Sequence, residues 1–224
     1  MSGQPEINRE QMVKKVEHVL LSPVLTEAET VAGSELAGEM GLAGVVVKPC
    51  FVHPAVTVLK GSEVIVGTVI GFPHGSNTAH VKIHEAKRAL TEGALVLELV
   101  LNHGYLRGGM LDHVRQDIRA VCGLAHMNGA RLRVIIESGI LTDQELIKAC
   151  KMIAAEGADG VVAGTGYGPQ SASLREIDVI RKAVGEGIPI KAQGGIQVVS
   201  DVIAFLDAGC SRVGVGDLAE VLGG

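Results

Sequence analysis

The sequence has few aromatic residues and no excess of basic ones. Its 224 residues include three Phe, two Tyr and no Trp, and the formal net charge is −5. This balance offers no basic surface, so we expect no nucleic-acid partner. Gly, Pro or charged residues break the apolar runs well before the roughly 18 residues that a membrane span needs. No hydrophobic segment follows N-terminal basic residues, so we expect no membrane partner and a soluble, cytoplasmic protein.

The four cysteines also lack any metal-binding pattern. Cys50, Cys122, Cys150 and Cys210 contain no C-x-x-C pair or other metal-ligand spacing. We expect reduced and mostly buried thiols. Only Cys50, next to Pro49 at the end of an expected strand, is placed to approach a site.

The sequence is rich in aliphatic residues, which suits strands that are buried on both faces. Short β-branched runs alternate with amphipathic helical stretches, and this alternation is typical of repeated βα units. Eight strands in about 200 residues favour a closed (β/α)8 TIM barrel over an open doubly wound sheet. We expect one domain over residues 1–224, with residues 1–12 as an N-terminal extension or helix. The expected strands are His18 to Leu21, Gly44 to Lys48, Val64 to Gly71, Leu95 to Asn102, Leu132 to Ser138, Gly160 to Thr165, Pro189 to Gly194 and Arg212 to Gly216.

Signals for helix ends support this division. Thr26, Thr142 and Ser173 each precede a Glu by three residues, which predicts helix starts with capping boxes. A Gly follows each of six expected helices just before a strand, and it predicts a left-handed helix end. These glycines lie in the phrases EMGLAG, TEGALV, MNGARL, AEGADG, GEGIPI and DAGCSR.

The chemistry of such barrels lies at the carboxyl ends of the strands. Lys48, Glu98, Glu137 and Lys191 fall at or near these ends, where a charge inside the barrel is costly unless it is paired or used. A buried Lys beside another cation loses its proton more easily, and the neutral amine can attack a carbonyl to form a Schiff base. A structural ion pair is the alternative explanation for these charges.

Glycines cluster after the last three expected strands. Exposed backbone amides in such loops can hold an anion such as phosphate, although tight turns alone also explain part of this pattern. The clusters are Gly164, Gly166 and Gly168, then Gly194 and Gly195, and finally Gly214 and Gly216.

Six phrases between about Val16 and Val215 resemble the deoxyribose-phosphate aldolase family. That family consists of class I aldolases on a (β/α)8 barrel, which join acetaldehyde to glyceraldehyde 3-phosphate through an enamine on lysine. The resemblance implies an enzyme that needs no metal or other cofactor and that forms a homodimer. The phrases are VEHVLLSP, GTVIGFPHGSNTAHVKIHEAKRAL, LELVLNHGYLRGG, RVIIESGILTDQELIKAC, EGADGVVAGTGYG and IPIKAQGGIQ.

The residues that match the family's catalytic positions differ in one decisive place. The sixth strand of the family reads Val-Lys-Thr-Ser-Thr-Gly-Phe, and its Lys is the nucleophile, whereas Val162 stands there in this sequence. Valine cannot form an imine, so the family's standard mechanism cannot operate at this position. The resemblance matches Lys191 to the family's second lysine, which lowers the pKa of the nucleophile. It matches Glu98 to an Asp that transfers protons, and Asn102 also matches.

Two further departures concern the substrate. After the eighth strand the family has Ser-Ser, which helps to bind the substrate phosphate, but this sequence has Gly216 and Asp217. A carboxylate repels a phosphate dianion, so an unphosphorylated substrate is favoured. Lys48 adds a cation on the second strand, where the family often has Asn or Tyr.

Our leading hypothesis is a divergent class I aldolase, a carbon–carbon lyase that acts next to a carbonyl of a small hydroxy-aldehyde, ketone or sugar-like substrate. The catalytic residues would be Lys191 and Lys48, one as imine former and the other lowering its pKa, with Glu98 moving protons. The expected substrate-binding residues are Glu17, Asn102, Glu137, Thr165, Gly166, Tyr167, Gly194, Gly195, Gly216 and Asp217.

Three alternatives remain open. His74 and His103 could ligate a divalent metal together with Glu98 or Glu17 and so assist a lyase. The barrel could instead be an isomerase or epimerase that uses Lys191 and Glu98 as acid and base. It could also be an inactive sugar-binding protein, because loss of the nucleophile is what a pseudoenzyme would show. We expect His80 and His84 to lie on the surface.

Overall fold

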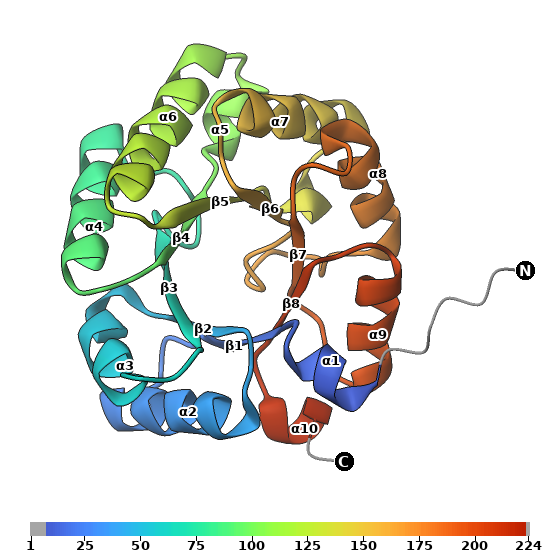
Figure 1. The fold of residues 1–224 in the computed structure, drawn as a ribbon. Helices are drawn as coiled ribbons and strands as arrows, with labels where there is room; N and C mark the ends of the chain where they lie inside the picture. The colour runs from blue at the N-terminus through green and yellow to red at the C-terminus, as the bar shows by residue number, and fades with distance from the viewer. Residues whose placement is uncertain (1–7, 223–224) are drawn as a thin grey trace, which may run out of the picture.

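A computed structural model shows a closed barrel of eight parallel strands and describes residues 8–222. The strands follow one another around the barrel in sequence order, and β1 pairs with β8 to close it (Figure 1). The predicted (β/α)8 barrel is therefore confirmed. The strands are β1 (Val16–Leu20), β2 (Gly44–Val47), β3 (Ile65–Ile70), β4 (Val96–Val100), β5 (Arg131–Ile135), β6 (Gly160–Val162), β7 (Ile190–Gln193) and β8 (Arg212–Val215).

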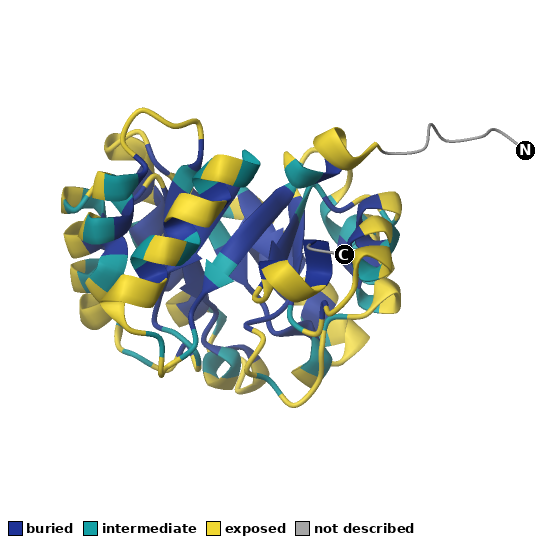
Figure 2. Cartoon of the chain, turned by 90° about the horizontal axis from the view of Figure 1, so that it is seen from below, coloured by how far each residue is buried: buried dark blue, intermediate teal, exposed yellow. Residues whose placement is uncertain are grey.

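The helices form a ring outside the strands. Figure 2 shows the buried strands at the centre and exposed residues on the outer faces of the helices. The helices are α1 (Arg9–Val13), α2 (Glu27–Met40), α3 (Val52–Val58), α4 (Ala79–Thr91), α5 (His103–Arg107), α6 (Leu111–Met127), α7 (Asp143–Ala155), α8 (Leu174–Val184), α9 (Val199–Asp207) and α10 (Leu218–Leu222), with short 3-10 turns η1 (Pro49–Phe51) and η2 (Ser138–Ile140).

Local sequence signals set the helix ends as predicted. Thr26, Thr142 and Ser173 each form a complete capping box with the Glu three residues later. Six glycines that follow α2, α4, α6, α7, α8 and α9 have positive φ, as expected for residues that turn the chain back toward the next strand. Because both signals depend on neighbouring residues alone, they could be recognised without knowledge of the fold.

The first and last helices lie side by side where the barrel closes. The guanidinium of Arg9 donates to the carbonyl of Leu222 at 2.6 Å, and this contact joins α1 to α10 (Figure 1). The expected N-terminal extension or helix over residues 1–12 overlaps α1 in residues 9–12, whereas residues 1–7 lie outside the described part of the chain.

Most strands end earlier than the sequence predicted. The expected sixth strand reached Thr165, but β6 ends at Val162. The residues beyond the strand ends leave the sheet because their side chains bond to loops and helix ends. Asn102 caps α5 by accepting from the amide of Tyr105, and Glu137 adopts a left-handed backbone with φ of 43°.

The inside of the barrel has a charged layer and an apolar layer. Because alternate residues of a strand point inward, the charged side chains lie one inward-facing position before the apolar ones. This spacing places the charged layer farther from the carboxyl ends of the strands. The charged layer consists of Glu17, Glu98, Arg133 and Lys191, and the apolar layer of Leu21, Val46, Val69, Val100, Ile135 and Val162.

Candidate active site

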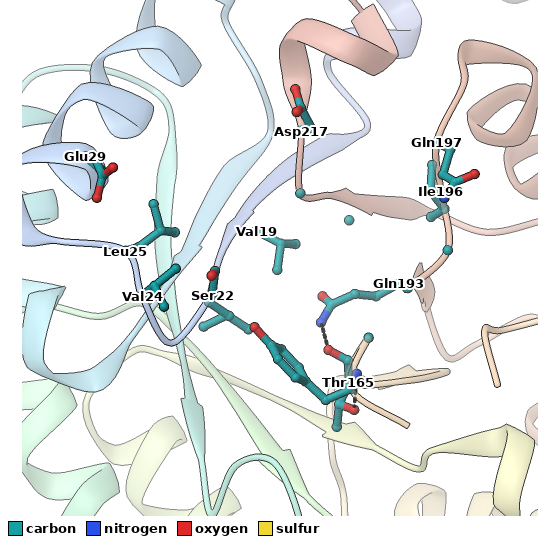
Figure 3. Close-up of a pocket in the computed structure, with 17 residues that line it drawn as sticks. Val19, Ser22, Val24, Leu25, Glu29, Thr165, Gln193, Ile196, Gln197 and Asp217 are labelled. Atoms are coloured by element: carbon teal, nitrogen blue, oxygen red, sulfur yellow. Dashed lines mark hydrogen bonds between the residues drawn. The ribbon is translucent and has the colours of Figure 1, made fainter. Parts of the chain in front are cut away.

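The main cavity lies at the carboxyl ends of β1, β6, β7 and β8 (Figure 3). Its volume is about 580 Å³, which is within the usual range for small-molecule sites. Seven of the expected substrate-binding residues line it, so the structure brings together residues from three separate loops. They are Thr165, Gly166, Tyr167, Gly194, Gly195, Gly216 and Asp217.

Two of these positions require glycine, because the neighbouring loops approach each other closely there. Gly166 and Gly194 have φ of 81° and 93°, a backbone region that side chains disfavour. A Cβ atom on Gly194 would lie only 2.9 Å from the Cα atom of Gly166. The loops after β6 and β7 therefore pack backbone against backbone at the edge of the main cavity.

Asp217 brings a carboxylate to the same cavity. Its side chain accepts a hydrogen bond from the amide of Glu220 at 3.0 Å, at the start of α10. The side chain is exposed and borders the cavity, so its negative charge acts on any ligand bound there. The preference for an unphosphorylated ligand stays a prediction.

A second, largely apolar cavity adjoins the main one at the ends of β1, β2 and β3. Its volume is about 510 Å³, and Leu21 and Tyr167 border both cavities. Lys48 lies on its wall and donates to the carbonyl of Leu25 at 2.5 Å and to that of Pro23 at 3.4 Å. Leu25 lines the main cavity and Pro23 the second one, so these hydrogen bonds tie the Lys48 amine to a segment that borders both cavities.

A third, smaller cavity of about 320 Å³ contains His74, His103 and Glu137. Glu137 is buried, and one of its oxygens accepts from both the amide and the hydroxyl of Thr165. Glu137 therefore fixes the loop that carries Thr165 along the main cavity. His103 contacts the carbonyl of Ile136 at 3.2 Å, and burial lowers its pKa.

The charged layer forms a closed network of ion pairs inside the barrel. The ammonium of Lys191 lies 2.8 Å from Glu98 and 2.9 Å from Glu17. The guanidinium of Arg133 lies 2.7 Å from Glu17 and 3.2 Å from Glu98. Burial acts to raise the pKa of Glu17, but Lys191 and Arg133 more than offset it and hold this pKa well below its usual range.

This network corrects part of the predicted site. Lys191 is 1% exposed and lines none of the three cavities described above, so it does not present an amine to a ligand. Lys191 is held by carboxylates rather than placed beside Lys48, so the expected coupling of two amines is wrong. Glu98 and Glu17 belong to the same network and also line none of the three cavities. Asn102 is occupied as the cap of α5.

The expected metal ligands do not converge either. Within residues 8–222, no group of three or more His, Cys, Asp or Glu side chains is arranged to hold a metal ion. Glu17 and Glu98 are bound to Lys191 and Arg133, whereas His74 and His103 border the third cavity. The metal-assisted alternative is therefore not supported by this set of residues.

The predictions for surface and buried residues agree with the structure. His80 and His84 are exposed. Cys122, Cys150 and Cys210 are free and buried, while Cys50 is exposed and lines the second cavity beside Lys48. No helix in the described part of the chain is long and apolar enough to cross a membrane.

Two residues of the interior were not predicted from the sequence. In the expected strand Leu132 to Ser138, Arg133 precedes Glu137 by four residues and would face the same side, a signal that was available although β5 ends at Ile135. Gln193 stands where the family phrase Lys-Ala-Ser-Gly-Gly-Ile has Ser, and it lines the main cavity. The departure at position 193 was visible in the phrase itself.

The ion-pair network predicts acid sensitivity. A carboxyl group with a lowered folded-state pKa stabilises the fold above its unfolded pKa of about 4, and this contribution is lost as the pH falls toward the folded value. We therefore expect the free energy of unfolding to fall below about pH 4 in the wild type, and to fall less steeply in Glu17→Gln.

Urea unfolding at a series of pH values measures this dependence. Glu63→Gln is the matched control, because the Glu63 side chain is 94% exposed. Identical pH slopes for wild type and Glu17→Gln would show that Glu17 does not titrate as the geometry requires.

Together, the closed barrel and the ligand-sized cavity at the carboxyl ends of its strands define an enzyme-type (β/α)8 barrel. No protein-family model matches the chain. The deoxyribose-phosphate aldolase of Caldanaerobacter subterraneus is 40% identical over 204 residues, covering 91% of this chain and 88% of that protein. The enzyme of the same name from Clostridium kluyveri is 36% identical over 96% of this chain and 99% of its own length.

Solved structures agree with these relatives. A deoxyribose phosphate aldolase from Aeropyrum pernix, described as tetrameric, has a TM-score of 0.89 and 26% sequence identity over 96% of this chain and 90% of its own. The chain belongs to the deoxyribose-phosphate aldolase family, a family of carbon–carbon lyases. The resemblance predicted from the six phrases is thus confirmed.

Proposed function

We propose that this protein is an aldolase-type lyase that uses Lys48 to act on a small hydroxy-aldehyde, ketone or sugar-like compound. The observation that carries the proposal is that Lys48 lines the second cavity and bonds to the segment of Pro23 and Leu25, which borders both this cavity and the main one. Of the residues that line the three cavities, Lys48 is the only lysine. The family's nucleophile position holds Val162, which has no amine, and Lys191 is buried within the barrel. No other lysine is therefore presented to a ligand in these cavities.

The proposed reaction follows the chemistry of an amine with a carbonyl. The neutral amine of Lys48 attacks the carbonyl carbon, and loss of water gives an iminium ion. Removal of the proton from the β-hydroxyl group breaks the bond between the α and β carbons, which releases one aldehyde and leaves an enamine. Protonation of the enamine carbon and addition of water then release the second carbonyl compound and restore the amine.

We do not assign Glu98 the proton transfers that we expected of it, because it is fully buried in the ion-pair network and lines none of the three cavities. We assign the proton transfers to Tyr167 and to solvent, since Tyr167 borders all three cavities. Burial raises the pKa of Tyr167, which keeps its phenol protonated and suited to donation. The carboxylate of Asp217 favours an unphosphorylated substrate.

Trapping with borohydride tests this proposal. We expect incubation with glycolaldehyde or 2-deoxy-D-ribose, followed by reduction and peptide mass mapping, to label Lys48. Adduct formation should increase with pH, because the neutral amine is the attacking form. Lys48→Arg keeps the positive charge and should abolish the adduct, whereas the exposed Lys87→Arg should not. Labelling that is spread over surface lysines, or that survives in Lys48→Arg, would reject Lys48 as the nucleophile.

A second candidate is a sugar-binding barrel without turnover. It is favoured by the two carbonyl groups that hold Lys48, because these hydrogen bonds give its amine a structural role that requires no reaction. Saturable binding of an unphosphorylated sugar without a trapped adduct or carbon–carbon cleavage would select this function. Assembly as a homodimer in the cytoplasm stays part of the proposal under either function.

A further inference from the structure

Gln193 carries a buried oxygen that the protein leaves without a partner. The residue is 2% exposed, and its Oε1 atom is one of two buried side-chain oxygen or nitrogen atoms without a hydrogen-bond partner in the described structure. The other is an oxygen of Glu98, inside the ion-pair network. A buried acceptor without a partner destabilises the fold, and such atoms are rare in native proteins.

The orientation of the Gln193 amide is fixed by its neighbour. Its Nε2 atom donates to the carbonyl of Thr165 at 3.2 Å. Because that carbonyl can only accept, the amino group must face it and the amide oxygen must face away. Figure 3 shows the Gln193 side chain extended across the cavity toward Val19 and Ser22, with its dashed hydrogen bond to Thr165.

The surroundings are shaped to hold this side chain in place. A Cβ atom on Gly214 would lie 2.9 Å from Oε1 of Gln193 and 2.9 Å from Cε of Lys191, so Gly214 leaves the space that Gln193 occupies. The carboxylate of Asp217 borders the same cavity. Two side chains thus offer hydrogen-bond acceptors there, a combination that suits a ligand with several hydroxyl or amino groups.

We propose that Gln193 is the recognition residue of the main cavity, and that its Oε1 atom accepts a hydrogen bond from a hydroxyl or amino group of a polyol-like ligand. The inference deepens the proposed function, since it uses the same cavity and names a feature of its substrate class. It is independent of the imine, because recognition of a hydroxyl group requires no covalent bond.

Sugar alcohols test the two ideas separately, since they contain no carbonyl and cannot react with Lys48. Calorimetric titration would compare ribitol with its 1-deoxy, 2-deoxy and 3-deoxy analogues. We expect the wild type to bind at least one deoxy analogue about tenfold more weakly than ribitol, because that ligand leaves Oε1 unpaired. Gln193→Met should bind ribitol and that analogue equally.

Two further variants complete the experiment. Gln193→Ser introduces the residue of the family phrase and withdraws the acceptor, so it should lose the discrimination even if Gln193→Met does not fold. Gln144→Met makes the Gln-to-Met change at an exposed site on α7 and should still discriminate between ribitol and the deoxy analogue. The inference is overturned if no polyol binds the wild type, or if folded Gln193 variants still discriminate. A missing Lys48 adduct would reject the imine and leave the recognition role intact.

Discussion

Lys191→Met is expected to lower the free energy of unfolding by about 3–5 kcal/mol, because removal of one member of a buried ion pair leaves an uncompensated charge. In the folded protein, Glu98 would then keep only the guanidinium of Arg133 at 3.2 Å. Glu17 would keep Arg133 at 2.7 Å and the more distant Arg212 at 3.8 Å. Lys191 itself is 1% exposed, so water cannot replace the lost ammonium without opening the barrel. Urea unfolding at neutral pH measures the change.

Two other variants test whether the loss of charge balance causes the fall in stability. Lys60→Met makes the same substitution on an exposed residue and should change stability by less than about 0.5 kcal/mol. The double variant Lys191→Met with Glu98→Gln restores neutrality and should recover part of the loss. If Lys191→Met is as stable as Lys60→Met, the network does not hold the barrel in the way we describe.

The network also explains why the site could be predicted only in part from the sequence. That Lys191 and Glu98 point into the barrel followed from the alternation of residues along a strand. The members of the network come from four strands that are far apart in the sequence, at positions 17, 98, 133 and 191. Whether an inward-facing residue belongs to the charged layer or borders the ligand cavity depends on how the strands are staggered relative to one another. No local sequence pattern encodes that stagger.

Residues of the loops were predicted more successfully than those of the interior. The motif after each of the last three strands placed Thr165, Gly194 and Asp217 on one cavity, since the carboxyl ends of parallel strands meet at one end of the barrel. Glu137 was singled out for its charge, yet its left-handed backbone and its bonds to Thr165 appear only in the structure. Gln193 shows that a departure from a family phrase can be as informative as a match.

Val162→Lys is expected to create an imine-forming amine where the wild type has none. Val162 is fully buried in the apolar layer and pairs in register with Lys191. In the wild type both carboxylates of the charged layer are already paired with Lys191 and Arg133, and Glu17 is also paired with Arg212. A new ammonium at position 162 would therefore lie beside existing cations without a carboxylate of its own, and both this repulsion and burial lower its pKa.

The lowered pKa favours the neutral amine, which can attack a carbonyl near neutral pH. We expect Val162→Lys treated with acetaldehyde and borohydride to acquire a stoichiometric adduct at residue 162, whereas the wild type should show none there. The longer side chain should also cost about 1–3 kcal/mol of stability through overpacking. Peptide mass mapping locates the adduct, and thermal unfolding reports the cost.

Val162→Met is the matched control, because it adds similar bulk without an amine. It should lose comparable stability from overpacking and acquire no adduct. An unlabelled but folded Val162→Lys would mean that the apolar layer and Gln193 close off this position, and the additional change Gln193→Ser would then be expected to open it. If that double variant also stays unlabelled, the loss of lysine at this position is not what separates this chain from the chemistry of its family.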